Sequence, residues 1–210
     1  MPTTLEKQFG SVPVTSSELN LALHEYRAPM SRVALHQRRG EIISLRRNLY
    51  LCSPESYSRE VIANRLLAPS YVSYETVLSA CGIIPERVYG VRSSCLARSR
   101  SFDNATGHYE YICVPREYYP EGVTINRTSD GMAYLVARPE KAICDLILAT
   151  SRLRLQSVKA VREYLECYLR VDMDAVAAWD ANLVHALAEL TTKKKNDLLN
   201  LERFLRHECL

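Results

Sequence analysis

The chain has 210 residues, of which 47% are hydrophobic and 24% are charged. This balance is typical of a globular protein and excludes a chain that is disordered along most of its length. The longest uninterrupted apolar run covers only residues 132–137, whereas a membrane-spanning helix needs about 20 such residues, so the sequence predicts no integral membrane protein.

Targeting and cofactor motifs are equally scarce. Residues 1–20 carry no apolar core behind a basic start, which predicts a cytoplasmic protein. None of the seven cysteines belongs to a C-x-x-C pair, so we expect buried, reduced thiols and no metal site. The chain lacks a phosphate-binding glycine loop, a G-x-S-x-G motif and an H-E-x-x-H motif. We therefore expect no cofactor, no catalytic residue and no enzyme.

The net charge of +3 is concentrated at one end of the chain. Residues 1–53 hold seven Lys/Arg and four Asp/Glu, whereas residues 54–210 hold twenty of each kind. A local excess of positive charge is the electrostatic pattern of a protein that binds a polyanion such as nucleic acid.

The first segment reads as two helices. Ser16 and Ser17 are residue types that begin helices, and an apolar face follows them. This face consists of Leu19, Leu21 (or Ala22), Leu23 and Tyr26. Pro29 breaks the first helix and suits the start of a second over residues 31–39. In the second helix, Val33 and Ala34, with Gln37 or Arg38, predict the inward edge. Little room for a full helix remains before Ser16.

A hairpin follows, and its tip is basic. The apolar runs 42–45 and 49–52 flank Arg46-Arg47-Asn48. Two helices and such a hairpin have the layout of a winged helix-turn-helix, whose second helix enters the major groove of DNA. We therefore predict that Arg32, His36, Gln37 and Arg39 contact the groove, and that Arg46 and Arg47 contact phosphates or the minor groove. A small helical cap with a solvated arginine face is the alternative.

The rest of the chain divides into a mixed part and a helical part. Residues 54–150 predict helices over 58–67, 73–82 and 140–149, with strands over 88–91, 108–114, 123–126 and 132–137 and at Phe102. Residues 151–210 have helical periodicity throughout. The predicted fold class is α+β: a winged helix-turn-helix over 1–53, a mixed α/β domain over 54–150, and a helical region over 151–210 packed on it.

Three charged features of these two parts have two readings each. Lys141 and Asp145 share one helix face, which suits either a small charged site or an ordinary helix ion pair. Residues 193–195 are three lysines at the start of the last helix, which suits either an anionic partner or a solvated loop. Arginines and tyrosines also alternate along the strands, which suits either a nucleic-acid face or ordinary sheet packing. These residues are Arg98, Arg100, Arg116, Tyr89, Tyr109, Tyr111, Tyr118 and Tyr119.

Three motifs between residues 39 and 147 resemble one known family. They are R-G-E-I-I-S-L-R-R-N-L-Y over 39–50; I-A-N-R-L with P-S-Y-V-S-Y-E-T-V-L-S and G-I-I-P-E between 62 and 86; and A-R-P-E-K-A-I-C-D-L-I over 137–147. They are similar to the AbiEi-type antitoxins, the transcriptional-regulator half of type IV toxin–antitoxin and abortive-infection loci. Asn48 stands where the family has a glycine, and asparagine also tolerates a positive φ.

The resemblance implies a function as well as a fold. A member of this family is a DNA-binding repressor that binds inverted repeats in double-stranded promoter DNA, represses its own operon and counteracts a nucleotidyltransferase toxin, without needing to bind that toxin directly. The motifs include Tyr71, Ser73, Glu140, Lys141 and Asp145, to which no role is assigned. Two alternatives stay open: a phosphotransfer or kinase-like enzyme that uses the Lys141/Asp145 pair on the toxin, and a protein-binding module without DNA activity.

Overall fold

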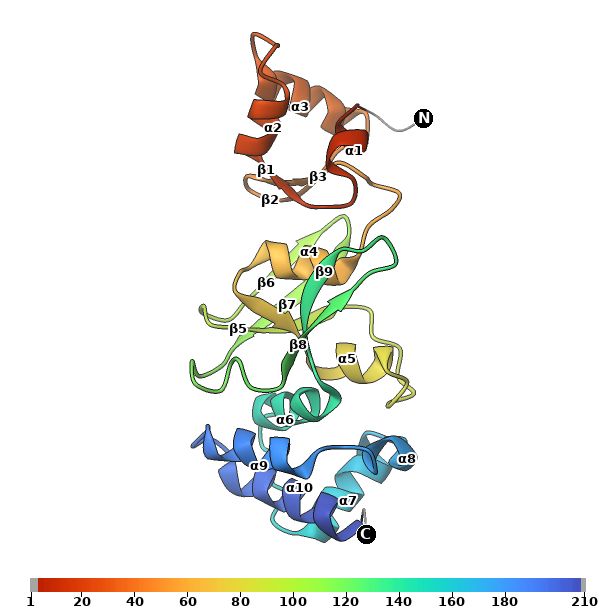
Figure 1. The fold of residues 1–210 in the computed structure, drawn as a ribbon, viewed down its shortest axis with the longest axis vertical. Helices are drawn as coiled ribbons and strands as arrows, with labels where there is room; N and C mark the ends of the chain where they lie inside the picture. The colour runs from red at the N-terminus through yellow and green to blue at the C-terminus, as the bar shows by residue number, and fades with distance from the viewer. Residues whose placement is uncertain (1–3, 209–210) are drawn as a thin grey trace.

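The computed structural model describes residues 4–208, which form three layers along one long axis (Figure 1). An N-terminal lobe lies at one end, a mixed sheet lies in the middle, and a group of helices lies at the other end. The described residues form ten α-helices, one π-helical turn and two sheets. The predicted α+β class is confirmed at this level.

The N-terminal lobe combines three short helices with a three-stranded antiparallel sheet in the order β1–β3–β2. Its elements are α1 (Thr4–Phe9), β1 (Val14–Thr15), α2 (Ser16–Ala22), α3 (Pro29–Arg38), β2 (Ile43–Arg46) and β3 (Leu49–Leu51). A capping box starts α2, because Thr15 and Glu18 each accept a hydrogen bond from the other's backbone N–H. The two predicted helices and the hairpin are present, and α1 is a helix that the sequence did not predict.

The middle layer is a six-stranded mixed sheet in the order β6–β7–β5–β4–β9–β8. Its strands are β4 (Ser70–Val72), β5 (Val91–Cys95), β6 (Arg100–Asn104), β7 (Gly107–Cys113), β8 (Val123–Arg127) and β9 (Ala133–Ala137). The pairs β5–β7 and β4–β9 are parallel and the others antiparallel. The strand predicted over 88–91 is wrong, because the strand begins at Val91, and β4 was not predicted at all.

Three helices flank this sheet: α4 (Arg59–Leu66), α5 (Tyr74–Ala80) and α6 (Pro139–Ala149). Helix α4 lies on the side of the sheet toward the N-terminal lobe, and α6 lies between the sheet and the C-terminal helices (Figure 1). Residues 140–148 of α6 are all buried, which follows from this central place. Helix α6 is therefore the element that joins the middle layer to the last one.

The last layer is helical over the described part of residues 151–210, as predicted. It contains α7 (Val158–Glu163), the π-helical turn η1 (Tyr164–Tyr168), α8 (Met173–Val176), α9 (Ala181–Glu189) and α10 (Lys195–Glu208). Helix α10 packs along α9 and α7. None of the helices among residues 4–208 is long and apolar enough to cross a membrane.

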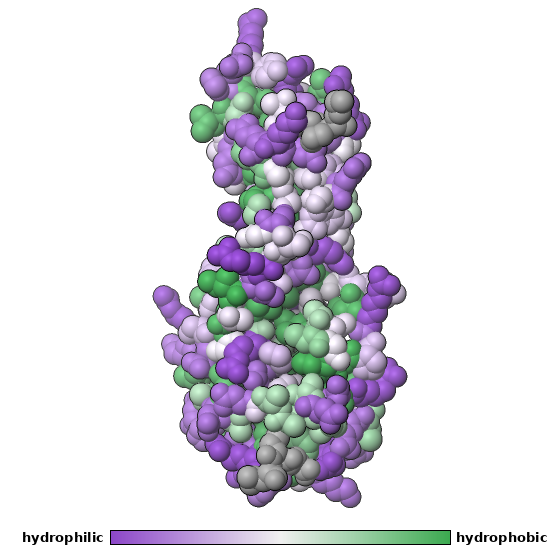
Figure 2. Space-filling model, turned by 45° about the vertical axis from the view of Figure 1, so that its right-hand side comes forward, coloured by the Kyte–Doolittle hydropathy of each residue, from purple (hydrophilic) through white to green (hydrophobic). Residues whose placement is uncertain are grey.

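Two hydrophobic cores hold these layers. A small one lies inside the N-terminal lobe, around Leu19, Val33 and Ile42. A large one runs through the sheet and the C-terminal helices, and it also includes Leu45, Leu49 and Leu51 of the N-terminal hairpin. In Figure 2, hydrophobic side chains that reach the surface gather over the middle layer, while the far end of the N-terminal lobe is mainly hydrophilic.

The cysteines differ from the prediction of buried thiols. Cys52, Cys95 and Cys144 are buried, whereas Cys81, Cys113 and Cys167 are exposed. The exposed ones lie at the end of α5, at the end of β7 and in the π-helical turn η1. These are element ends or surface turns, where a small apolar side chain is easily tolerated.

Candidate nucleic-acid interface

Helix α3 presents a basic face to solvent because only its other face packs on the lobe. Val33 is completely buried in the small core. Arg32, Ala34 and Arg38 are exposed, while His36 and Gln37 are half-buried. The prediction that Ala34 lies on the inward edge is therefore wrong, and Arg38 joins the exposed face. Gln37 accompanies Val33 on the inner side, as one of the two predicted arrangements has it.

The four residues predicted to contact the groove fall into two pairs. Arg32 and Arg39 are exposed, and the Arg32 guanidinium lies 4.5 Å from the ring centroid of Tyr26. The His36 Nδ1 atom lies 2.5 Å from the Glu41 carboxylate, so its ring turns toward the start of the hairpin. Gln37 is half-buried beside it. The structure thus presents two of the four side chains openly, and it adds Arg38 to them.

The tip of the β2–β3 hairpin is exposed and cationic. Arg46, Arg47 and Asn48 are all exposed, and the Arg46 Nη1 atom donates to the Arg47 carbonyl oxygen at 3.4 Å. Asn48 has a φ of 63°, which confirms the positive φ expected where the family has a glycine. The backbone carbonyl of Asn48 accepts from the Ser16 N–H, so the tip is attached to the start of α2.

No carboxylate within residues 4–208 pairs with these arginines. The ion pairs that the structure shows elsewhere involve Arg92, Arg138, Arg162, Arg170 and Arg206. None of them involves the arginines of α3 or of the hairpin tip, which are Arg32, Arg38, Arg39, Arg46 and Arg47. Exposed guanidinium groups without a carboxylate are free to bind phosphate bidentately. The N-terminal lobe therefore carries a surface suited to a polyanion.

Exposed apolar side chains accompany this basic surface, and the sequence did not predict them. Leu21 is 74% exposed, Tyr26 44% and Met30 38%. Leu21 and Tyr26 had been expected on the inward face of a helix reaching Tyr26. That helix ends at Ala22, so Tyr26 belongs to the connection between α2 and α3, and its ring supports Arg32 instead.

The family-motif residues meet in a second, buried cluster. Lys141 is 0% exposed and Asp145 is 1% exposed. The Asp145 Oδ2 atom accepts from Ser73 Oγ at 2.6 Å and from Ser94 Oγ at 3.2 Å, and its Oδ1 atom accepts from the Tyr118 hydroxyl at 2.8 Å. One carboxylate thus links α6, β5, the start of α5 and the segment after β7.

Lys141 lies within the same cluster, above aromatic rings. Its Nζ atom donates to the Tyr118 carbonyl oxygen at 2.7 Å and lies 3.1 Å from the centroid of the Tyr118 ring. The Asp145 Oδ1 atom is 3.7 Å away, and the Tyr71 ring centroid is 5.5 Å away. Burial lowers the pKa of Lys141 from 10.5 to about 8, against the opposing effect of Asp145.

Tyr71 completes the cluster without a hydrogen bond of its own. Its hydroxyl is buried and has no partner within the described residues, and burial raises its pKa well above 10, with the Asp145 charge acting in the same direction. Glu140, the remaining motif residue, stands apart: its Oε1 atom accepts from Arg138 and from the backbone N–H of Asp180. It holds α9 against the start of α6.

This burial bears on the enzymatic alternative. A phosphotransfer site needs its charged groups open to a substrate, whereas both charges of the Lys141/Asp145 pair are closed off from solvent. Asp145 accepts three hydrogen bonds and Lys141 donates one. A buried ion pair with such partners fixes the geometry of the elements around it. The arrangement favours a structural role for these motif residues.

The arginines and tyrosines of the sheet also separate. Tyr109, Tyr111 and Tyr118 are buried in the large core, whereas Arg98, Arg100 and Arg116 are exposed. The Tyr111 hydroxyl donates to the Ala63 carbonyl oxygen at 2.6 Å, which ties the sheet to α4. Tyr119 is half-buried, and Tyr89, which precedes β5, is 77% exposed. Buried rings cannot stack on bases, so ordinary sheet packing describes Tyr109, Tyr111 and Tyr118 better than a nucleic-acid face.

Comparisons with known proteins add no assignment. No protein-family model matches the chain, and no curated protein matches it. The residues 4–208 hold no group of three or more His, Cys, Asp or Glu side chains placed to bind a metal ion.

Proposed function

We propose that this chain is a DNA-binding transcriptional regulator of the AbiEi antitoxin type, and that its N-terminal lobe is a winged helix-turn-helix. The observation that carries the proposal is the set of exposed arginines on α3 and at the β2–β3 tip, which have no carboxylate partner within residues 4–208. In this proposal α3 enters the major groove and the hairpin tip contacts the flanking backbone.

The order of elements supports this assignment of roles. The lobe runs α1–β1–α2–α3–β2–β3, so the helix before the hairpin is the second of two adjacent helices, as a recognition helix should be. A helix about 10–12 Å across fits a major groove about 12 Å wide. Arg32, Arg38 and Arg39 then reach the groove, and Arg46 and Arg47 reach phosphates on its edge.

Promoter binding by a charge-reversed hairpin tests the DNA-binding part. The double variant Arg46→Glu/Arg47→Glu should bind the DNA upstream of its own gene much more weakly than the wild type. The slope of log K against log salt should fall by about one to two units if both side chains contact phosphates. Fluorescence anisotropy over a salt series measures both quantities.

A matched control distinguishes direct contact of the hairpin tip with DNA from an effect of the protein's net charge. Arg116→Glu/Lys159→Glu changes the net charge equally at two exposed positions outside the N-terminal lobe, and its affinity should stay close to that of the wild type. Equal losses in both double variants would show that only long-range charge matters, and an unchanged affinity of the hairpin variant would remove the tip from the interface.

Growth rescue tests the antitoxin part. Co-expression of this chain with a nucleotidyltransferase toxin encoded beside it should restore growth, and the Arg46→Glu/Arg47→Glu variant should rescue equally well. We expect this because the resemblance assigns toxin counteraction to the part of the chain after the N-terminal lobe, away from the hairpin tip. Growth arrest that the wild-type chain leaves unchanged would contradict the antitoxin assignment.

A further inference from the structure

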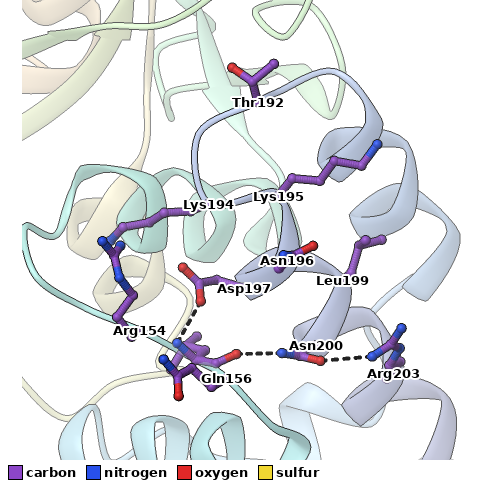
Figure 3. Close-up of a pocket in the computed structure, with 11 residues that line it drawn as sticks. Arg154, Gln156, Thr192, Lys194, Lys195, Asn196, Asp197, Leu199, Asn200 and Arg203 are labelled. Atoms are coloured by element: carbon purple, nitrogen blue, oxygen red, sulfur yellow. Dashed lines mark hydrogen bonds between the residues drawn. The ribbon is translucent and has the colours of Figure 1, made fainter.

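A cavity of about 660 Å³ lies in the C-terminal helical layer, between the segment before α7 and the start of α10 (Figure 3). Its volume falls within the range of about 300–1,000 Å³ that is usual for small-molecule sites. The DNA-binding proposal does not use this region, which belongs to the opposite end of the molecule from α3 (Figure 1).

Positive side chains dominate the wall of this cavity. Arg154, Lys194, Lys195 and Arg203 line it, and Asp197 is the single carboxylate among its lining residues. Lys195 is paired with Glu189 at 2.6 Å. The other three cations have no carboxylate within hydrogen-bonding distance in the part of the chain that the structure describes.

The one carboxylate is already committed to the backbone. The Asp197 Oδ1 atom accepts from the Leu155 N–H at 2.7 Å, and the Asn200 amide donates to the Leu155 carbonyl oxygen at 2.7 Å. Arg203 in turn donates to the Asn200 side-chain oxygen at 3.2 Å (Figure 3). These bonds hold the floor of the cavity rigidly and position Arg203 beside it.

Two positive side chains lie next to each other on the opposite side of the cavity. Lys194 lies beside Arg154 (Figure 3), and its ammonium group donates to the Ile147 and Thr150 carbonyl oxygens at the end of α6. Burial lowers the pKa of Lys194, the charge of Asp197 opposes this, and the charges of Lys193 and Arg154 lower it further. Arg154, Lys194 and Arg203 outnumber Asp197, the one carboxylate of the lining, so the cavity keeps a net positive potential, to which the positive end of α10 adds.

We propose that this cavity binds a small ligand with two or more linked phosphate groups, either free pyrophosphate or the phosphate chain of a nucleotide. Arg154 lies before α7 and Arg203 lies on α10, with their guanidinium groups at opposite sides of the cavity (Figure 3), so only a ligand with several linked anionic groups can contact both. Guanidinium groups match phosphate oxygens bidentately, and the start of a helix favours phosphate over a neutral ligand. A cavity of this volume suits a small molecule rather than a duplex.

Calorimetric titration of the full chain tests this proposal, with pyrophosphate, ATP and adenosine as probes. We expect pyrophosphate and ATP to bind with a Kd below about 1 mM and adenosine not to bind. Equal affinities for pyrophosphate and ATP would identify the phosphate chain as the whole determinant, whereas tighter ATP binding would identify a nucleotide; both results support the site.

Two variants on exposed positions decide where the ligand binds. Arg154→Ala/Arg203→Ala should weaken pyrophosphate binding by at least about tenfold. Arg206→Ala lies on the same helix outside the cavity, bonded to Glu202 and Asn182, and should leave the affinity within about twofold of the wild type. Circular dichroism confirms that each variant is folded.

Three results would overturn the proposal. They are the absence of pyrophosphate and ATP binding at millimolar concentration, an affinity that Arg154→Ala/Arg203→Ala leaves unchanged, and a loss of duplex DNA binding in that variant as large as that of Arg46→Glu/Arg47→Glu. The last result would make the cavity part of a nucleic-acid surface. Failure of this proposal leaves the N-terminal DNA interface untouched, because the two tests use different residues.

Discussion

Lys141 is a lysine that the fold buries completely, against two tyrosine rings and one backbone carbonyl. A buried charge is tolerated only where it is paired and hydrogen-bonded, and Asp145 at 3.7 Å supplies the opposite charge. The Asp145 carboxylate also accepts hydrogen bonds from Ser73, Ser94 and Tyr118. Within the described residues, the Lys141 ammonium has one acceptor besides that carboxylate, the Tyr118 carbonyl oxygen. The lysine is therefore the weaker member of the pair.

This imbalance predicts a pH-dependent stability. The pKa of Lys141 is about 8 in the folded chain and 10.5 when unperturbed, so the unfolded chain binds more protons between these values. The free energy of unfolding contributed by this group therefore rises with pH across that window. Above pH 8, the free energy of unfolding of the wild type should rise relative to that of Lys141→Met by up to about 1.4 kcal/mol per pH unit. Urea unfolding at several pH values between about 7.5 and 9.5 measures the difference.

The exposed Lys159 supplies the control for this measurement. Lys159→Met changes the same residue type at the surface of α7, and its difference from the wild type should not vary with pH. A constant difference for Lys141→Met as well would mean that Lys141 stays charged across the whole window.

The same cluster explains what sequence patterns can and cannot predict here. Ser93 and Ser94 are completely buried, and Ser94 is there because its hydroxyl donates to Asp145. Hydrophobic periodicity assigns two serines to the surface and therefore predicts the strand over 88–91, whereas β5 covers Val91–Cys95. The motif residues Tyr71, Ser73, Lys141 and Asp145 were recognised individually, but their convergence depends on contacts across more than 70 positions of sequence.

At the scale of elements, local signals were the most reliable guide. Ser16 and Pro29 lie at helix starts as predicted, although the N-cap of α2 is Thr15, one residue before the predicted serines, and Asn48 marks the hairpin turn. Strand β4 was missed because it has only three residues, all buried, and therefore shows no alternation. For the lysines at 193–195 the sequence leaves two alternatives, an anionic partner or a solvated loop. Lys194 in fact precedes α10 and neutralises the negative end of α6.

The hairpin turn supplies a prediction about this element. Asn48 adopts a φ of 63°, which glycine adopts without strain and a β-branched residue does not. Asn48→Gly should leave the free energy of unfolding nearly unchanged, and Asn48→Val should lower it by about 1–2 kcal/mol. Chemical denaturation of the three proteins checks this. Equal stability of the valine variant would mean that the turn has an alternative conformation of similar energy.

For the whole molecule, the hairpin is also the connection between layers. Leu45, Leu49 and Leu51 pack into the large core rather than into the small core of their own lobe. The Asn104 side chain donates to the Leu45 carbonyl oxygen at 3.1 Å, and Ser11 donates to Asp130 at 2.6 Å. The proposed DNA-binding lobe is thus anchored to the sheet through its own wing strands, in addition to the irregular segment 52–58 that connects β3 to α4.

A shared core predicts that the layers unfold together. Leu49 is 4% exposed, and Leu49→Ala should lower the free energy of unfolding by about 2–4 kcal/mol. Trp179 is the single tryptophan of the chain and lies in the opposite layer, 8% exposed. Its fluorescence and the far-UV circular dichroism should shift to the same lower denaturant midpoint, because loss of packing at the hairpin is transmitted through one cooperative unit.

The control is Leu21→Ala, which changes a leucine on the same lobe that is 74% exposed. By either signal, this variant should change the free energy of unfolding by no more than about 0.5 kcal/mol. A Trp179 transition that stays at the wild-type midpoint in Leu49→Ala would show that the N-terminal lobe unfolds on its own, and the anchoring would then be too weak to fix the orientation of α3 relative to the sheet.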